Sequence, residues 1–501
     1  MRRFIFLSAV VSVVSASPYP TRSARSTGSP TVKLDLATVT GISSDASATE
    51  QFLGIPFAQP PTGNLRYKLP VAIQPYKTSF SANDYGPYCL QVTDNFPGIP
   101  AYPAHSESED CLSINVIRPA GYESEKLPVV AWIFGGGFDS GGSDGYDGSA
   151  IVQKSVNIQS PVIYVSFNHR TNGMFIFPLF SSEIIVLTIA LGFGFLASQE
   201  LTDAGVANLG LHDPLQMLLN NGNNEGLFRA AFSSSGSPLP IGSYTHGQKY
   251  YDGAVAAVNC TGSKDTLACL RTVPAAMLQA YFMALPDKAS YQAIASPWLP
   301  RVDGKFLKED PQQLVLKGST DADFREFLST VYYPNATSAD IDLITGLYPS
   351  DPAVGSPFGS GDSNVVYPQY KRVAAFQGDV AFQAPRRFFL QHRAPLQNVW
   401  SYLYQRNRTS SVLGSYHTID QFNMFGSTSN GTELQDYLIN FANNLNPNGH
   451  TVPEWPQYEA TSRKLLTFVD GAAFNATTIS QDTYRADALT GLTAISLKYP
   501  F

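Results

Sequence analysis

Ala131-Trp132-Ile133-Phe134-Gly135-Gly136-Gly137-Phe138 is an apolar run that passes directly into three consecutive glycines. The apolar residues predict a buried strand, and the glycines predict a loop whose backbone is bare of side chains. Backbone N–H groups in such a loop can approach a negatively charged ligand oxygen closely, which is the build of an oxyanion hole. An oxyanion hole works beside a nucleophile, yet the rest of the 501 residues offers no credible nucleophile motif.

Other apolar runs predict the surrounding sheet. Leu127–Phe134 and Val162–Phe167 are nearly continuous apolar segments, as expected of strands buried on both faces of a parallel or mixed sheet. Leu396–Tyr404 predicts a further strand, which leads into the loop Gly414–Asp420 with His417. Strands interleaved with helical segments indicate one open α/β sheet.

Length and composition limit the class of protein. With 44% apolar and 15% charged residues, the chain has a globular composition, long enough for two or three average domains or one large α/β domain. The formal net charge of −7 is spread without acidic or basic runs. This pattern argues against nucleic acid and anionic membrane surfaces as partners.

The N-terminus has the pattern of a secretory signal. Arg2-Arg3 supplies the positive start, Phe4–Val14 the apolar core and Ser15-Ala16-Ser17 the small residues of a cleavage region. We expect residues 1–16 to be removed and residues 17–501 to be secreted as one domain; a structural N-terminal helix is the alternative.

An exported protein can form disulfides and carry glycans. The cysteines are even in number and fall into two local pairs, which suits two disulfides that close short loops; they are Cys89, Cys111, Cys260 and Cys269. Five sequons fit glycosylation, although chance alone would supply several; they are Asn259, Asn335, Asn407, Asn430 and Asn475.

The stretch Gly173–Leu191 is apolar enough to suggest a membrane span. Glu183 lies in its middle, where a charge costs roughly 2.5–3.5 kcal/mol in a bilayer. Pro178 and two serines also disfavour a span. We therefore expect no membrane association unless residues 173–191 prove to be a true transmembrane helix.

Several motifs together resemble those of the type-B carboxylesterases and lipases, above all the secreted fungal ones. In chain order they are Phe52-Leu53-Gly54-Ile55-Pro56-Phe57-Ala58-Gln59-Pro60-Pro61, Glu109-Asp110-Cys111-Leu112, the three glycines, Asn168-His169-Arg170, Phe193-Gly194-Phe195-Leu196-Ala197, Leu211-His212-Asp213, Phe228-Arg229-Ala230-Ala231, Ser235-Gly236-Ser237-Pro238 and Gly414-Ser415-Tyr416-His417. Each motif is weak alone, but the ordered set is specific.

This resemblance implies an α/β-hydrolase with a mostly parallel central sheet flanked by helices. It implies hydrolysis of small-molecule or lipid esters by a Ser–Glu–His triad, without metal or organic cofactor. Gly136 and Gly137 match two oxyanion donors and His417 the catalytic histidine. The resemblance also implies the disulfide pairs Cys89–Cys111 and Cys260–Cys269.

The nucleophile and the acid of the family are missing. The family's Gly-x-Ser-x-Gly elbow belongs between Asp213 and Phe228, which here are separated only by Pro214–Leu227. Gly141-Gly142-Ser143-Asp144-Gly145 lies elsewhere and is interpreted as a chance match. The family's glutamate segment is also absent, and Glu309 and Asp310 are interpreted as solvated flanking residues.

We hypothesise that two exon segments are lost and that a small intron is retained at residues 173–191, where Gly173-Met174-Phe175 can be encoded with the intron start GTATGT. The lost central strand would forfeit about 8–15 kcal/mol, as much as a whole domain's stability of about 5–15 kcal/mol. We therefore expect an incomplete fold and an inactive chain. The alternative is a noncatalytic binding or adhesion protein on the same scaffold.

Overall fold

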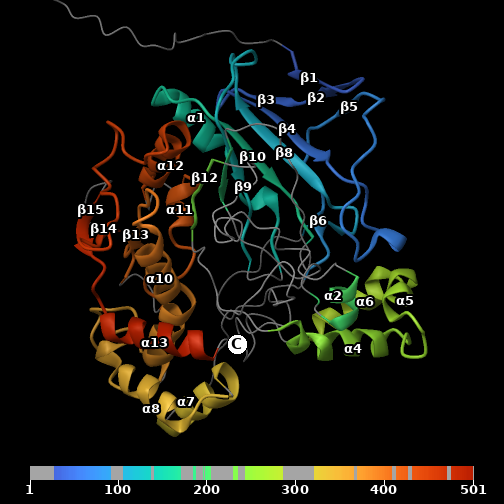
Figure 1. Cartoon of the computed structure of the whole chain (residues 1–501). Coiled ribbons are helices and arrows are strands. Elements are labelled where there is room, and N and C mark those ends of the chain that lie inside the picture. The colour runs from blue at the N-terminus through green and yellow to red at the C-terminus, as the bar shows by residue number, and fades with distance from the viewer. Residues whose placement is uncertain are drawn as a thin grey trace, which may run out of the picture.

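The computed structural model of the chain describes residues 28–91, 105–136, 140–170, 184–187, 196, 198–204, 229–234, 243–285, 321–333, 335–365, 369–408, 413–426, 431–470 and 476–499. A seven-stranded sheet of order β12-β11-β9-β10-β8-β4-β3 lies at the centre of these residues (Figure 1). Its strands are β3 (Ile42–Ser44), β4 (Thr49–Pro56), β8 (Ser113–Pro119), β9 (Val129–Trp132), β10 (Ile163–Phe167), β11 (Ile184–Leu187) and β12 (Ala230–Ala231).

The sheet is mixed. β12, β11, β9 and β10 run parallel to one another, whereas β8, β4 and β3 continue the sheet with antiparallel neighbours. β9 and β10 lie within the apolar runs 127–134 and 162–167, and most of their residues are buried. These two predicted strands are confirmed, because continuous apolar runs suit strands covered on both faces.

β11 occupies a position that the sequence analysis expected to be empty. Its residues 184–187 belong to the apolar stretch 173–191, and they pair in parallel with β9 on one side and β12 on the other. Ile184, Ile185 and Val186 are β-branched, and such residues favour strands. Part of the stretch interpreted as an insertion thus completes the sheet.

Helices cover the sheet and extend beyond it. They are α1 (Ser149–Asn157), α2 (Gln199–Asp203), α4 (Gln248–Ala257), α5 (Thr266–Thr272), α6 (Ala275–Met283), α7 (Asp321–Phe327), α8 (Ser338–Leu347), α9 (Tyr370–Gly378), α10 (Ala384–Arg393), α11 (Gln421–Met424), α12 (Glu433–Asn444) and α13 (Ala486–Lys498). α1 packs on β8 and β10 and is itself covered by α12.

Smaller sheets complete the architecture. They are β1 (Thr31–Leu34), β2 (Ala37–Thr40) and β5 (Phe80–Ser81); β6 (Tyr88–Cys89) and β7 (Glu107–Ser108); and β13 (Tyr402–Tyr404), β14 (Lys464–Phe468) and β15 (Thr477–Gln481). β13 is shorter than the predicted strand Leu396–Tyr404, because Leu396 lies in a turn that follows α10, with its N–H bonded to the Arg393 carbonyl.

Two disulfides close short loops. Cys89 is bonded to Cys111 across 22 residues of sequence, and Cys260 to Cys269 across 9. The first joins the end of β6 to the start of β8, and the second joins the end of α4 to α5. Both pairs are those that the family resemblance implies.

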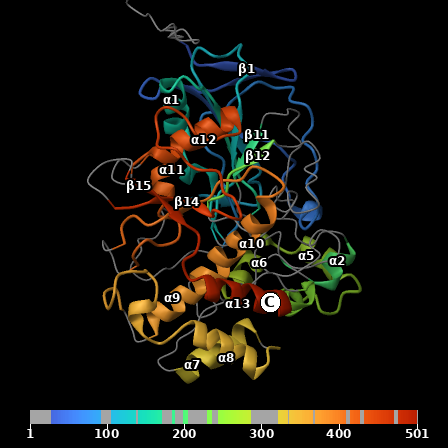
Figure 2. The ribbon, with the colours of Figure 1, turned by 60° about the vertical axis from the view of Figure 1, so that its left-hand side comes forward.

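Among the described residues, two apolar clusters are the largest. One lies between the sheet and its helices and contains Trp132, Phe134 and Tyr164. The other joins α7, α8, α9 and α13 around Phe376 and Leu492. Both views of the molecule place α7 and α8 together at the end opposite β1 (Figures 1 and 2).

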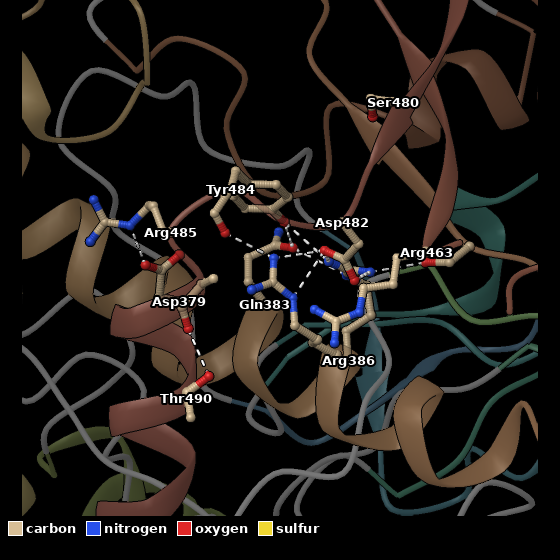
Figure 3. A network of polar contacts seen from close by, with 12 residues as sticks. Asp379, Gln383, Arg386, Arg463, Ser480, Asp482, Tyr484, Arg485 and Thr490 are labelled. Atoms are coloured by element: carbon tan, nitrogen blue, oxygen red, sulfur yellow. Dashed lines mark hydrogen bonds and ion pairs between the residues drawn. The ribbon is translucent and has the colours of Figure 1, made fainter. Parts of the chain in front are cut away.

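A buried polar network connects α10 to the segment before α13 (Figure 3). The Asp482 side chain is fully buried, and its Oδ1 lies 2.8 Å from Arg386 and 2.7 Å from Arg387. Burial opposes ionisation of this carboxyl, but the two guanidinium groups hold its pKa below the ordinary value. Asp482 therefore remains charged and ties two distant segments together.

Within the described ranges, none of the helices is long and apolar enough to cross a membrane. The apolar stretch 173–191 is described only at 184–187, where it forms β11. The predicted signal segment, residues 1–16, lies outside the described residues.

Candidate active site

The glycine loop begins where β9 ends. Ile133 and Phe134 extend the buried run beyond Trp132, and the backbone then turns at Gly136. The Ser140 N–H donates to the Gly136 carbonyl, 3.3 Å away. A Cβ at position 136 would lie 1.8 Å from the Ser140 carbonyl oxygen, so only glycine fits this turn. Gly137, the other predicted oxyanion donor, lies outside the described residues.

Ser143, the serine of the chance Gly-x-Ser-x-Gly motif, is buried and hydrogen-bonded within the fold. Its side chain is 1% exposed. Its hydroxyl donates to Asn168 Oδ1 at 2.8 Å and accepts from Asn115 Nδ2 at 2.9 Å. Its backbone N–H also donates to Asn168. A serine nucleophile needs a histidine to take its proton, and here an amide oxygen takes that position.

The predicted catalytic histidine stands on a tightly fixed turn, Gly414–Asp420. The Ser415 hydroxyl donates to the Tyr404 carbonyl at the end of β13. Thr418 has φ +78°, which is strained for a β-branched residue. The His417 side chain is exposed, and its ring stacks on Phe382 with 4.6 Å between centroids.

Contacts of Asp420 and Phe425 attach this turn to the central sheet and to β13. The Asp420 carboxylate accepts from the Ser234 hydroxyl and from the Tyr402 hydroxyl, each at 2.6 Å. Ser234 follows β12, and Phe425, just beyond α11, packs on Trp132 at the end of β9.

The attachment fixes where the histidine turn lies. β9 and β12 are both parallel to β11, so their carboxyl ends share one edge of the sheet. The turn with His417 is tied to this edge, which also bears the glycine loop. Ligands of open α/β sheets bind at that edge. Asp420 belongs to no motif that would mark it in the sequence; its one signal is a carboxylate directly before a helix.

The neighbouring histidine of the Asn168-His169-Arg170 motif is unsuited to catalysis. His169 is fully buried, and among the described residues neither of its ring nitrogens has a hydrogen-bond partner. Its ring stacks on Phe134, 4.0 Å between centroids. Burial lowers the pKa of His169 to about 3, so the imidazole is a neutral packing group at neutral pH.

Other predicted residues lie outside the described ranges or at the surface. Glu309, Asp310 and the segment between Asp213 and Phe228 are outside, as are two of the predicted glycosylation sites, Asn430 and Asn475. Asn259 and Asn335 are exposed, and Asn407 is half-buried. Among the residues that the structure describes, no three His, Cys, Asp or Glu side chains gather in a way that could hold a metal ion.

Comparison with known proteins identifies relatives of this chain. A model of the carboxylesterase family matches residues 28–183 and 193–329. Lipase 4 of Diutina rugosa is 32% identical, with 92% of this chain and 93% of the relative covered. Secreted lipase 1 of Botryotinia fuckeliana (strain B05.10) is 31% identical, with 89% and 90% covered.

The fold has a solved counterpart. The crystal structure of Aspergillus niger EstA matches with a TM-score of 0.71 at 22% sequence identity and covers 94% of this chain and 99% of that one. The order of strands, the helices on the sheet and this match establish the α/β-hydrolase fold.

Proposed function

Because the chain belongs to the carboxylesterase family, we propose that it is the scaffold of a secreted carboxylic ester hydrolase that lacks its own nucleophile. In this proposal Gly136 and Gly137 donate to the oxyanion of a small-molecule or lipid ester, and His417 is the general base. The attachment of the His417 turn to the sheet edge that bears the glycine loop carries the proposal.

The proposal includes the absence of turnover by this chain. The alignment with Lipase 4 spans 553 positions, more than the 501 residues of the whole chain, so that relative has residues which this chain lacks. The family model leaves residues 184–192 unmatched. Loss of a serine nucleophile costs about 10⁶ in kcat, even when the rest of the site is intact.

A chromogenic short-chain ester tests this proposal. We expect the chain to hydrolyse p-nitrophenyl butyrate no faster than its His417→Ala variant. We expect turnover to appear when the missing elbow and acid segments of a fungal relative are built in and the apolar stretch 173–191 is removed, because β11 otherwise occupies the place of the elbow strand. Turnover by the unaltered chain that disappears in Ser143→Ala would overturn the proposal and assign the nucleophile to Ser143.

The origin of the defects has its own test. Lost exon segments and a retained intron predict a mature transcript that lacks codons 173–191 and contains the elbow segment. A transcript that encodes the 501 residues unchanged would contradict this origin. The alternative of a noncatalytic binding protein would then gain support, because the family scaffold would be kept without its nucleophile.

A further inference from the structure

The oxyanion turn at Gly136 is followed by a loop, and side chains of another segment contact this loop at several residues. The Gly141 N–H donates to Gln91 Oε1 at 2.6 Å. A Cβ at position 142 would lie 2.3 Å from the Tyr88 ring, so this ring rests directly on the backbone of Gly142. The Tyr88 hydroxyl donates to the Asp144 carboxylate. Each contact fixes a different part of the loop.

The residues that make these contacts come from the two ends of the Cys89–Cys111 loop. Tyr88 and Gln91 lie on either side of Cys89, and His105 lies just before β7, which precedes Cys111. The His105 ring stacks on Tyr88 with centroids 4.1 Å apart and an interplanar angle of 6°. His105 Nδ1 lies 3.1 Å from Asp144 Oδ2. The Cys89–Cys111 disulfide therefore links the two parts of the chain whose side chains contact the loop after Gly136.

These contacts are transmitted to the oxyanion turn through the backbone. A Cβ at Gly141 would lie 2.6 Å from the Phe134 ring and 2.7 Å from the Gly135 carbonyl. Ser140, the preceding residue, closes the turn at Gly136. A displacement of Gly141 must therefore move Ser140 and with it the turn.

We propose that Tyr88, Gln91 and His105 are positioning residues, which hold the oxyanion loop in place from the Cys89–Cys111 side. The inference rests on the proposed role of Gly136. Oxyanion donors work only when they are preorganised at the position where the charge develops. The contacts that Tyr88, Gln91 and His105 make with the loop supply this preorganisation.

Hydrogen exchange measured by mass spectrometry tests the inference without requiring ester turnover. We expect Gln91→Leu to speed exchange in peptides that cover 133–146 by about tenfold, while peptides that cover 162–170 keep their rates. Gln91→Glu keeps an acceptor oxygen for Gly141 and is expected to restore most of the protection. Gln153→Leu removes a glutamine on α1 that bonds the distant Ala46 carbonyl, and serves as the matched control.

The remaining outcomes overturn the inference. Unchanged exchange over 133–146 in Gln91→Leu would show that the loop does not depend on this contact. Equal acceleration in both sets of peptides would show a general structural role. Tyr88→Phe, which keeps the ring and removes the hydroxyl bonded to Asp144, gives a second reading if Gln91→Leu fails to fold. The exchange rates do not depend on ester turnover. A result of the ester assay that contradicts the proposed function therefore does not decide whether these residues position the loop.

Discussion

The Phe425 ring packs edge-on against Trp132, with ring centroids 4.8 Å apart and an interplanar angle of 77°. Trp132 is the last residue of β9, from which the glycine loop departs, and Phe425 follows the helix that begins just after the His417 turn. This pair therefore connects two elements of the candidate site that are far apart in sequence.

Replacement of Phe425 tests the strength of this connection. We expect Phe425→Ala to lower the free energy of unfolding by about 2–3 kcal/mol, because it empties a partly buried aromatic site. Phe422, on the helix α11 that precedes Phe425, is 47% exposed, so Phe422→Ala should change the free energy of unfolding by less than about 0.5 kcal/mol. Denaturant unfolding measures both; equal losses would contradict a specific role for the pair.

Acidification is expected to destabilise the fold through His169. The pKa of His169 is about 3 in the folded chain and about 6.5 in an unfolded one. Below pH 6.5 the unfolded chain binds a proton that the folded chain refuses, so stability falls as the pH falls from 6.5 to 3. The loss is about 1.4 kcal/mol per pH unit over this window.

The pH dependence can be isolated by substitution. His169→Phe should flatten the stability curve between pH 6.5 and 3 relative to the parent chain. His392→Gln, which replaces an exposed histidine on α10, should leave the curve unchanged. Parallel curves for the parent and His169→Phe would refute the assignment.

Asp482 should be among the least replaceable polar residues. Asp482→Asn leaves Arg386 and Arg387 buried without their countercharge, which typically costs about 3–5 kcal/mol. Asp487→Asn changes an exposed carboxylate in the first turn of α13 and should cost less than about 1 kcal/mol. Thermal unfolding distinguishes the two; similar midpoints would show that the network contributes little.

The turn at Gly136 should reject any side chain. Gly136→Ala places a methyl group 1.8 Å from the Ser140 carbonyl, so the backbone must shift and exchange over 133–146 should accelerate. Gly145→Ala is the control, because no described residue other than its chain neighbours comes within 4 Å of the new methyl group. Equal exchange in the two variants would contradict the close approach.

The sequence predicts those parts of the fold that depend on local patterns. The apolar runs of β9 and β10 are recognisable without any partner, because burial on both faces leaves no alternation to detect. The loop with His417 is likewise found where the motif places it. The central strand was expected to be absent, since the elbow segment of the family is missing between Asp213 and Phe228; residues 184–187, within the stretch interpreted as an insertion, instead form β11.

Contacts between distant residues are what the sequence cannot predict. Asp420 meets Ser234 across 186 residues, and neither belongs to a recognisable spacing. Ser143 shows the reverse case, a motif without its environment, because only the folded chain shows that its hydroxyl is engaged by two asparagines. Sequence patterns identify individual strands and motifs, whereas only the packing of the folded chain shows which of their residues are in contact.

The position of β11 determines how an elbow strand could be restored to this chain. Ile184–Leu187 pairs with both β9 and β12, so a grafted elbow strand would find its neighbours already occupied. Insertion alone would set two segments in competition for one gap in the sheet. A successful graft must exchange the apolar stretch for the new strand, not add to it.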